Sequence, residues 1–404
     1  MTFLEYYISN RMKSLKPSAI REIFKYAADP STISLAAGDP APESLPVEDI
    51  ERILGELTKE NPMTALLYSQ SEGHPPFRDA LKKFVKNRYQ AFDECRDDLI
   101  VTTGAQQCMD LVCKVLCNEG DTIICEDPSF IGSLNTFRSY NVNLVGVPMD
   151  EDGINLEKLE AALRTNTNIR ILYLIPNFQN PTGITMSLAK RRACYKLAKQ
   201  YGVVLLEDNP YGDLRFTGET LPTIKSMDTD GIVVYAGTFS KILSTGIRVG
   251  YLVAPSGLMG KIVVGKQCTD VHTSMLGQLL AYRFLTECDI DAHIEKNKKI
   301  YSEKCSLMLN RIEKCFPAEV RHTSPEGGLF IWSVLPKGMD GSEFATQLVR
   351  DNKVCVVPGI AFSITGRDHQ NCFRMNFSMP SPDKIETGVG RAGELIRAMM
   401  KQTG

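Results

Sequence analysis

The chain has 404 residues, which is too long for one ordinary hydrophobic core and indicates two or three domains, or one large α/β domain with a smaller companion. Hydrophobic residues make up 43% of the sequence and charged residues 23%, as in ordinary globular proteins. The formal net charge of -2 provides no basic field for nucleic acid, so the composition favours a small-molecule partner.

The amino-terminal stretch MTFLEYYISNRMKSLKPS has no apolar core of signal-peptide length. No run in the chain approaches the roughly 18 consecutive apolar residues of a membrane span. We therefore expect a cytoplasmic protein without a membrane partner. The 12 cysteines include no C-x-x-C pair, and several lie inside apolar runs, so we interpret them as buried, reduced side chains and expect no metal site.

The middle of the chain alternates short apolar runs with amphipathic segments. Strands are predicted at 98–104, 121–127, 143–149, 169–176, 203–208, 232–240 and 249–255. Helices are predicted at 105–116, 129–140, 155–164 and 188–202. Short apolar strands separated by helices imply a parallel sheet that is buried on both faces. The predicted fold class is therefore α/β, and ligands of such sheets bind at the carboxyl ends of the strands.

The pattern changes near residue 257. Two long helical patterns, 257–287 and 290–315, are followed by apolar runs at 327–336, 353–362 and 371–380, and by a last helix at 383–401. This succession predicts a second, smaller α+β domain. We expect residues 40–288 to form the large domain, and residues 1–39 together with 289–404 to form the small one.

The segment TFSKILSTGIRVGY places Lys241 just past a predicted strand, with hydroxyls at Thr238 and Ser240 and a second cation, Arg248, seven residues later. Hydroxyls and an arginine suit an anion with many oxygens. Lys241 is then available as an amine nucleophile, because a desolvated lysine beside another cation has a lowered pKa and forms Schiff bases readily. Taken alone, a solvated surface turn explains this segment better.

Asp208 ends the strongly apolar strand in VVLLEDNPYGDL, so its carboxylate needs a buried partner. A protonated pyridine nitrogen would serve, and Tyr211 could then hydrogen-bond a hydroxyl on the same ring. A helix cap or a structural salt bridge explains Asp208 equally well.

Three further turns follow predicted strands. In NFQNPTG the amide of Asn180, which precedes a proline, could donate to a phenolic oxygen. In VTTGAQQ the backbone N–H groups of Ala105 and Gln106 open a helix and could hold phosphate. In CEDPSF the ring of Phe130 could stack on an aromatic ligand. As isolated patterns these are an ordinary turn, a common strand-to-helix turn and a core phenylalanine.

Arg374 lies inside the apolar run NCFRMNFS, where an unpaired charge is costly. A carboxylate ligand bound by both guanidinium edges would satisfy it. The alternative is a structural pair with an acidic residue elsewhere in the chain.

In this order along the chain, the segments resemble the fold-type I pyridoxal-phosphate aminotransferases, in the branch of the aminoadipate and kynurenine aminotransferases. The resemblance extends over nearly the whole chain and includes ISLAAGDP (33–40), LLYSQSEGHPPFRDAL (66–81) and PEGGLFIW (325–332) besides the segments above. It implies a mostly parallel seven-stranded sheet sandwiched by helices, with pyridoxal 5'-phosphate as the cofactor. No G-x-G-x-x-G, G-x-S-x-G or H-E-x-x-H pattern suggests another enzyme class.

The resemblance also implies a role for each residue of the cofactor site. Lys241 would form the Schiff base and then move the substrate proton, and Asp208 would pair with the ring nitrogen. Asn180 and Tyr211 would contact the ring hydroxyl. Phe130 stands where relatives often carry tyrosine, and Ala105 where close relatives often carry serine. The phosphate would be held by Thr238, Ser240, Arg248 and the Ala105–Gln106 turn.

The substrate residues implied by the resemblance are Arg374 for the α-carboxylate, Gly38 beside it, and Asn180. Arg21 resembles an arginine that relatives bring toward the substrate side chain, where it would suit a distal carboxylate; a surface helix arginine is equally plausible. Tyr68 resembles a tyrosine that is donated across a dimer interface to the neighbouring site. This implies a C2 homodimer with two composite sites.

The predicted activity is amino-group transfer between an L-amino acid and a 2-oxo acid, with glutamate and 2-oxoglutarate as one pair and ping-pong kinetics. A β-lyase that acts on cysteine conjugates would use the same cofactor residues and is the main alternative. A cofactor-sensing regulatory domain is a second alternative. It is disfavoured because such proteins carry an amino-terminal DNA-binding module, whereas here the aminotransferase-like region begins near residue 18.

Overall fold

The computed structural model describes residues 7–13, 15, 29, 31–60 and 62–403. Its largest feature is an eight-stranded sheet in the order β2-β9-β8-β7-β6-β3-β4-β5. The strands are β2 (Asp97–Thr102), β3 (Thr122–Asp127), β4 (Asn143–Asp150), β5 (Gly153–Ile154), β6 (Ile169–Leu174), β7 (Val204–Asp208), β8 (Val233–Thr238) and β9 (Gly250–Pro255).

The sheet is mostly parallel, which confirms the predicted fold class. Strands β8, β7, β6, β3 and β4 pair in parallel, whereas β9 runs antiparallel to both β8 and β2. The two-residue strand β5 pairs antiparallel with β4 and adds an eighth strand to the seven that were predicted. Because β2 and β8 both run opposite to β9, the carboxyl ends of β2, β3, β6, β7 and β8 share one edge.

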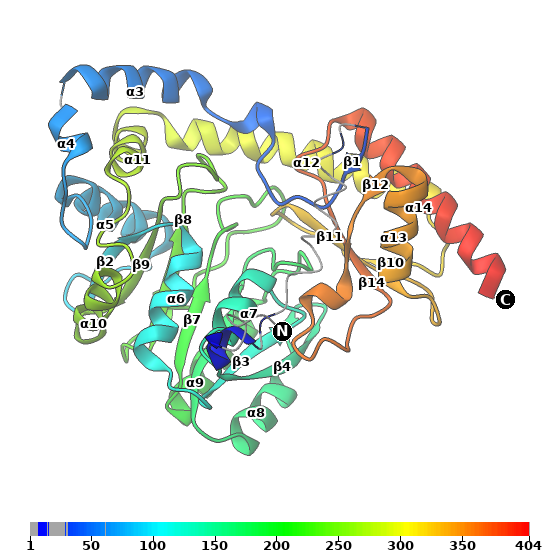
Figure 1. The fold of residues 1–404 in the computed structure, drawn as a ribbon, viewed down its shortest axis with the longest axis horizontal. Coiled ribbons are helices and arrows are strands. Elements are labelled where there is room, and N and C mark those ends of the chain that lie inside the picture. The colour runs from blue at the N-terminus through cyan, green and yellow to red at the C-terminus, as the bar shows by residue number, and fades with distance from the viewer. Residues whose placement is uncertain (1–6, 14, 16–28, 30, 61, 404) are drawn as a thin grey trace.

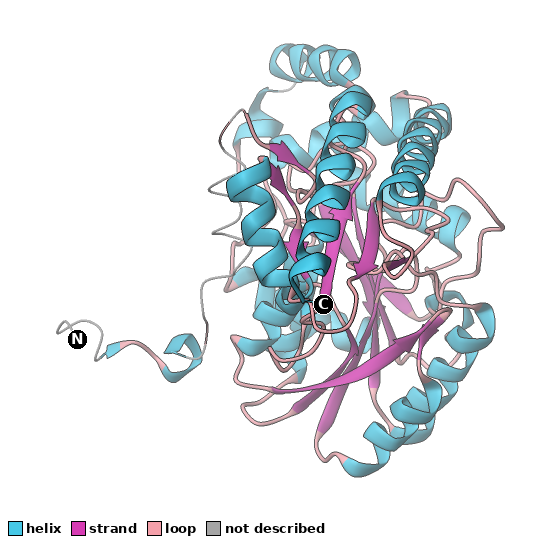
Figure 2. Cartoon of the chain, turned by 90° about the vertical axis from the view of Figure 1, so that its right-hand side faces the viewer, coloured by secondary structure: helices cyan, strands magenta, loops and turns pink. Residues whose placement is uncertain are grey.

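Helices cover both faces of this sheet (Figures 1 and 2). They are α6 (Ala105–Leu116), α7 (Ile131–Arg138), α8 (Leu156–Thr165), α9 (Leu188–Tyr201) and α10 (Ser256–Gln267). Met109 of α6 and Leu134 of α7 belong to one apolar cluster, and Leu159 of α8 and Cys194 of α9 belong to another. The sheet is therefore buried on both sides, as its uniformly apolar strands require.

The prediction of one helix over 257–287 is wrong, because α10 and α11 (Met275–Glu287) are separate. Between them Val271 adopts a left-handed φ of 65°. Asp270 and Thr273 both accept hydrogen bonds from the buried Lys266 Nζ, at 2.9 and 3.1 Å. These contacts hold the connecting turn and end the helix. The next pattern, 290–315, forms one helix, α12 (Ile290–Cys315).

A second sheet is antiparallel and has the order β10-β11-β14-β13. Its strands are β10 (Arg321–His322), β11 (Phe330–Val334), β13 (Val357–Pro358) and β14 (Cys372–Asn376), and the helices α13 (Gly341–Asn352) and α14 (Pro382–Thr403) lie beside it. Near the amino terminus, β1 (Ile33–Ser34) pairs in parallel with β12 (Val354–Cys355). This pairing supports joining residues 1–39 to 289–404, although the exact domain limits stay a prediction.

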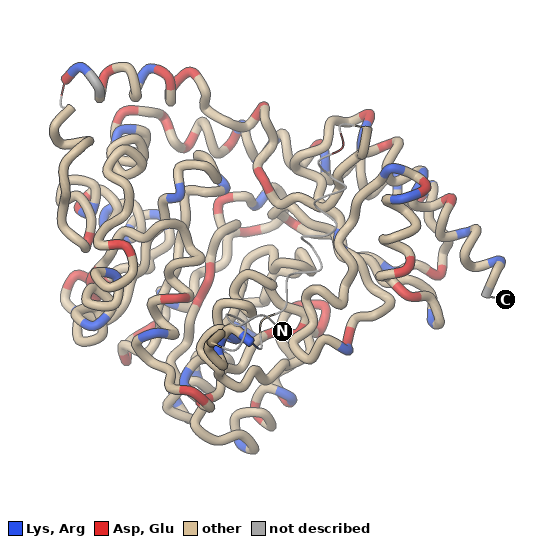
Figure 3. The backbone as a smooth tube through the Cα atoms, viewed as in Figure 1, with Lys and Arg blue, Asp and Glu red and all other residues tan. Residues whose placement is uncertain are grey.

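The remaining helices precede the large sheet or connect strands within one of the two sheets. They are α1 (Asn10–Lys13), η2 (Pro42–Ser44), α3 (Val47–Glu60), α4 (Pro62–Leu66), α5 (Pro75–Tyr89), η3 (Lys225–Met227) and η4 (Gly359–Phe362). Acidic and basic residues are interspersed along the backbone (Figure 3). All twelve cysteines are free and eight of them are buried, in agreement with the prediction. None of the described helices has the length and apolarity needed to cross a membrane.

Candidate active site

A cavity of about 450 Å³ lies between the carboxyl edge of the large sheet and strands β11 and β14. It brings together twelve of the fourteen residues that were predicted from the sequence. They are Gly38, Ala105, Gln106, Phe130, Asn180, Asp208, Tyr211, Thr238, Ser240, Lys241, Arg248 and Arg374.

The strand ends explain this convergence. Asp208 is the last residue of β7 and Thr238 the last residue of β8, and these two strands are hydrogen-bonded neighbours. Asn180 follows β6, Phe130 follows β3, and Ala105 follows β2. Since these strands end at one edge, Ala105 and Thr238, which are 133 positions apart in the sequence, line one cavity with the other three residues.

The amine of Lys241 donates to the carbonyl oxygen of Gly38 at 2.8 Å. Burial and the positive charges of Arg248 and Arg374 lower the pKa of Lys241 to about 8, against the opposing carboxylate of Asp39. A sizeable fraction of this amine is therefore uncharged near neutral pH, as a nucleophile or proton acceptor requires.

The carboxylate of Asp208 is only half satisfied. Its Oδ2 atom accepts a hydrogen bond from the Tyr173 hydroxyl at 2.8 Å, while its buried Oδ1 atom has no donor in the described chain. Burial raises the pKa of Asp208 to about 7. No described cation forms a salt bridge with Asp208, so the structural-pair alternative is not observed. A cationic donor that enters the cavity would complete the pairing.

Asn180 links Tyr211 to Arg374. Its amide nitrogen donates to the Tyr211 hydroxyl at 3.3 Å, and its amide oxygen accepts from Arg374 Nη1 at 2.7 Å. All three side chains are buried, and burial raises the pKa of the Tyr211 hydroxyl above its ordinary value. A protonated phenol and an amide nitrogen therefore face the same part of the cavity.

Arg374 is a buried cation without an acidic partner in the described chain. Its Nη2 atom donates to the Ala36 carbonyl at 2.7 Å, and its buried Nε atom has no acceptor. The guanidinium carbon lies 4.1 Å from the ring centre of Phe330 and 4.9 Å from that of Phe362. Burial lowers the pKa of Arg374 to about 10. The cavity therefore offers a pre-positioned guanidinium to a carboxylate ligand.

The opposite part of the cavity is suited to an oxyanion. The Thr238 hydroxyl donates to Ser240 Oγ at 2.9 Å, and Arg248 Nη1 donates to the same Oγ atom at 3.4 Å. Ala105 begins α6 without a side-chain N-cap. Gly104 has a φ of 76°, and a Cβ atom there would lie 2.3 Å from Arg248 Nη2. The arginine, two hydroxyls and open helix terminus form an anion cradle that a bulkier residue 104 would fill.

Phe130 and Gln106 lie together at the wall formed by α7. Phe130 is half-buried, and a Cβ atom on Gly132 would lie 2.6 Å from its ring. The side chain of Gln106 donates to the Gly132 carbonyl at 2.8 Å and to the Thr136 hydroxyl. Its amide nitrogen is therefore engaged within the protein, and the binding of an anion by its backbone N–H stays a prediction.

Two supporting residues were not identified from the sequence. Tyr173, the donor to Asp208, is an ordinary aromatic residue within an apolar strand. Gln179 is completely buried and donates to the Pro128 carbonyl at 2.8 Å, while its amide oxygen accepts from the hydroxyl of Thr182 at 2.8 Å. It thus joins the turn before Phe130 to the turn that holds Asn180. Only its position next to Asn180 could have drawn attention to it.

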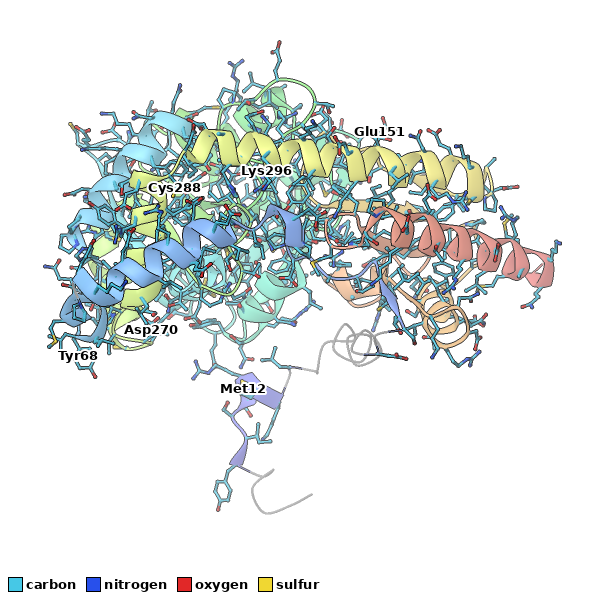
Figure 4. The ribbon with its side chains drawn as sticks, turned by 90° about the horizontal axis from the view of Figure 1, so that it is seen from above. Met12, Tyr68, Glu151, Asp270, Cys288 and Lys296 are labelled. Atoms are coloured by element: carbon cyan, nitrogen blue, oxygen red, sulfur yellow. The ribbon has the colours of Figure 1, made fainter. Side chains whose placement is uncertain are left out.

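Two predicted residues do not line the cavity in the described chain. Tyr68 is 89% exposed and packs edge-on against His272 with ring centres 5.8 Å apart; Figure 4 shows it at the periphery of the molecule. Arg21 lies outside the described residues.

The geometry fits one cofactor. The orphaned Asp208 oxygen suits a protonated ring nitrogen, and the Tyr211–Asn180 pair suits a phenolic oxygen. The cradle around Arg248 suits a phosphate, and the amine of Lys241 suits an aldehyde. A fold and cavity of this kind define a pyridoxal-phosphate enzyme of fold type I.

Comparison with known proteins agrees. Residues 30–391 match the family described as aminotransferase class I and II, and the chain belongs to this family. It is 38% identical to the aromatic-amino-acid aminotransferase 1 of Thermococcus litoralis (98% of this chain, 96% of that protein) and 34% identical to the 2-aminoadipate transaminase of Thermus thermophilus (96% and 95%). The crystal structure of Pyrococcus horikoshii kynurenine aminotransferase, in complex with PMP, superposes with a TM-score of 0.94 at 35% identity and covers 98% of each chain. The protein is an aminotransferase, and its cofactor is pyridoxal phosphate.

Proposed function

We propose that this aminotransferase works in a ping-pong cycle between an L-amino acid and a 2-oxo acid, with glutamate and 2-oxoglutarate as one pair. The observation that carries the proposal is the buried, unpaired guanidinium of Arg374 in the same cavity as the Lys241 amine. A carboxylate bound there presents its α-carbon to the part of the cavity that holds this amine. Both substrates of a transamination carry such a carboxylate, so one site can serve them in turn.

Bound pyridoxal phosphate supplies a cationic ring that accepts the electron pair left when the substrate Cα loses its proton. In the proposed mechanism Arg374, Asn180 and the Gly38 backbone orient the substrate carboxylate. Lys241 Nζ takes the proton from the substrate Cα and would deliver it to the cofactor, which the lowered pKa of this amine favours. Asp208 would keep the ring nitrogen protonated. Its Oδ1 atom has no other hydrogen-bond donor in the described chain and can therefore accept from the protonated nitrogen.

The other proposed contacts hold the cofactor in place. Tyr211 and Asn180 face the ring oxygen, and Phe130 covers the ring. Thr238, Ser240, Arg248 and the backbone of Ala105 and Gln106 hold the phosphate. Their common position around one cavity supports these roles.

The dicarboxylate pair is supported by a relative named for 2-aminoadipate, an amino acid with a second carboxylate. Arg21 is our proposed partner for that distal carboxylate. The relative named for aromatic amino acids supports a second class of donor at the same site.

We further propose a C2 homodimer in which Tyr68 completes the phosphate site of the partner. The 89% exposure of Tyr68 outside its own cavity supports this arrangement. Several apolar side chains near it are also exposed, among them Met63 (59%), Leu66 (71%) and Leu67 (57%), and such a patch favours a protein interface. The twelve free cysteines support the proposed cytoplasmic location.

The test is a half-reaction followed by visible absorbance. Protein loaded with pyridoxal phosphate should be yellow, lose this colour with L-glutamate and regain it with 2-oxoglutarate. If the protein keeps its colour with glutamate but loses it with an aromatic amino acid, glutamate is not a substrate, but the proposed transamination stands. Release of pyruvate and ammonia from a cysteine conjugate, without any 2-oxo acid acceptor, would instead favour the β-lyase.

A further inference from the structure

A second cavity, of about 330 Å³, shares a wall with the active site. The wall is the segment 208–215. Asp208, Pro210 and Tyr211 line the active-site cavity, whereas Asn209, Gly212, Asp213 and Arg215 line the second one. The second cavity therefore lies against the segment that carries two of the proposed cofactor contacts.

The lining of the second cavity carries more positive than negative charge. Arg88, Arg215 and Lys298 contribute three cations, and Asp213 is the one acidic side chain among the described lining residues. Asp213 is itself shared, since it accepts from Arg88 and from the Tyr89 hydroxyl.

Two other acidic side chains that pair with these cations are largely exposed to solvent. Asp291, which pairs with Arg88, has a side chain that is 76% exposed, and Glu295, which pairs with Lys298, is 69% exposed. Such exposed pairs are weak and are screened by salt. Arg88 is compensated further by Asp213, whose side chain is only 9% exposed, so the attraction left for an anion inside the cavity comes mainly from Lys298.

Arg215 is the strongest indication of a missing ligand. The residue is only 7% exposed; its Nη1 atom bonds Glu326 at 2.6 Å, but its buried Nη2 atom has no acceptor in the described chain. Behind the wall, Arg191 is completely buried and donates to the lining residue Asn177 and to carbonyl oxygens, with no described carboxylate among its partners. Arg215 is paired with Glu326, and the charge of Glu207 acts on Arg191. The buried Nη2 atom of Arg215 nevertheless stays an unsatisfied donor in the described chain, and an anion in the cavity would satisfy it.

We propose that this second cavity is a binding site for a small oxyanion with two negative charges, of the phosphate or dicarboxylate class. Arginine binds both kinds of group through paired N–H donors, and lysine adds a point charge. Because the anion would rest against segment 208–215, its occupancy is linked to the placement of Asp208 and Tyr211. The site is separate from the cofactor's phosphate cradle, which lies around Arg248.

The experiment is equilibrium dialysis of the enzyme loaded with pyridoxal phosphate, so that the cofactor's own phosphate site is filled. Labelled inorganic phosphate and labelled succinate are tested separately at low ionic strength. The decisive variant is Lys298→Gln, because Lys298 is a helix-surface residue whose loss leaves the fold intact. Arg350→Gln is the matched control, since Arg350 has a side chain that is 66% exposed and pairs only with Asp351.

Wild type and Arg350→Gln should bind the preferred anion with equal affinity, as one equivalent of phosphate or as one equivalent of succinate beyond any that binds at Arg374. Lys298→Gln should bind it about fivefold more weakly, as expected for removal of one partly exposed charge, and Arg215→Gln should lose it. If Lys298→Gln weakens the binding of phosphate, the site is assigned to phosphate. If it weakens the binding of succinate, the site is assigned to dicarboxylates. Succinate bound at Arg374 is unaffected by Lys298→Gln and does not confuse the result. If neither anion distinguishes Lys298→Gln from Arg350→Gln, the proposal is overturned.

Discussion

Replacing Asp208 with asparagine should remove a pH-dependent loss from the free energy of unfolding of the cofactor-free protein. Burial raises the pKa of Asp208 from 3.8 to about 7. Between these two values the folded protein keeps a proton that the unfolded chain has released. The free energy of unfolding therefore falls as the pH rises through this window, and it levels off above pH 7. At about 1.4 kcal/mol per pKa unit, the full window corresponds to about 4 kcal/mol.

The assay compares urea unfolding of wild type and Asp208→Asn, both free of cofactor, at pH 5, 6, 7 and 8. The stability of the variant relative to wild type should rise by about 3 kcal/mol between pH 5 and pH 8, because this interval covers about two thirds of the window. Burial also raises the pKa of Glu126 to about 8, with a smaller contribution from the charge of Asp208. The contribution of burial is common to both proteins, so most of the Glu126 titration cancels in the difference.

Loading with pyridoxal phosphate should reverse the comparison, because a protonated ring nitrogen gives the ionised Asp208 its missing donor. The cofactor should then stabilise wild type more than Asp208→Asn at pH 8. If the difference in stability between the two cofactor-free proteins is the same at every pH, Asp208 is not a buried carboxylate with a raised pKa, and this prediction is refuted.

Three further variants test other parts of the site. Lys241→Ala should slow the glutamate half-reaction, followed by stopped-flow absorbance, by at least about a thousandfold; a change of less than tenfold would exclude Lys241 as the proton carrier. Arg374→Lys should lower kcat/KM by about 30-fold or more, mainly through KM, because lysine cannot grip a carboxylate with paired donors; Arg350→Lys should have unaltered kinetics. Gln179→Ala should lower the free energy of unfolding by about 1–3 kcal/mol, because it leaves the buried Pro128 carbonyl and Thr182 hydroxyl without their partner. Unchanged urea unfolding would show that water replaces the amide.

Local patterns predicted the regular elements well. The helix over 105–116 has the bounds of α6, because its apolar residues recur at helical spacing and Gly104 precedes it in a conformation that suits glycine. The break between α10 and α11 was missed because it depends on polar side-chain contacts. Lys266 Nζ bonds Asp270 and Thr273 within the turn, and it also bonds Gln107 Oε1 at 2.7 Å, a residue 159 positions away. Helical periodicity carries no information about such a contact.

The sequence predicted which residues belong to the site, but not which residues contact one another there. Strand ends and chemical type made Asp208, Asn180 and Lys241 candidates, and the family resemblance of the segments in their order along the chain selected them. Their meeting in one cavity depends on the strand order, which places β7 between β6 and β8. The same order brings Tyr173 to Asp208, since β6 and β7 are neighbours. A tyrosine in an apolar strand looks the same in sequence whether it fills the core or supports a catalytic acid.

The arrangement of opposite charges in the cavity shows what the fold is built to receive. Asp208 and Arg374 carry opposite charges in one cavity, and each is buried without a charged partner in the described chain, yet they do not form a salt bridge with each other. Instead, the neutral side chain of Asn180 accepts from Arg374 Nη1 and Tyr173 donates to Asp208, so the two charges stay apart. This separation costs stability in the free protein. It also leaves Asp208 available for a cationic ring and Arg374 available for a carboxylate, with the Lys241 amine in the same cavity. A cofactor and a substrate that must be held side by side require this arrangement.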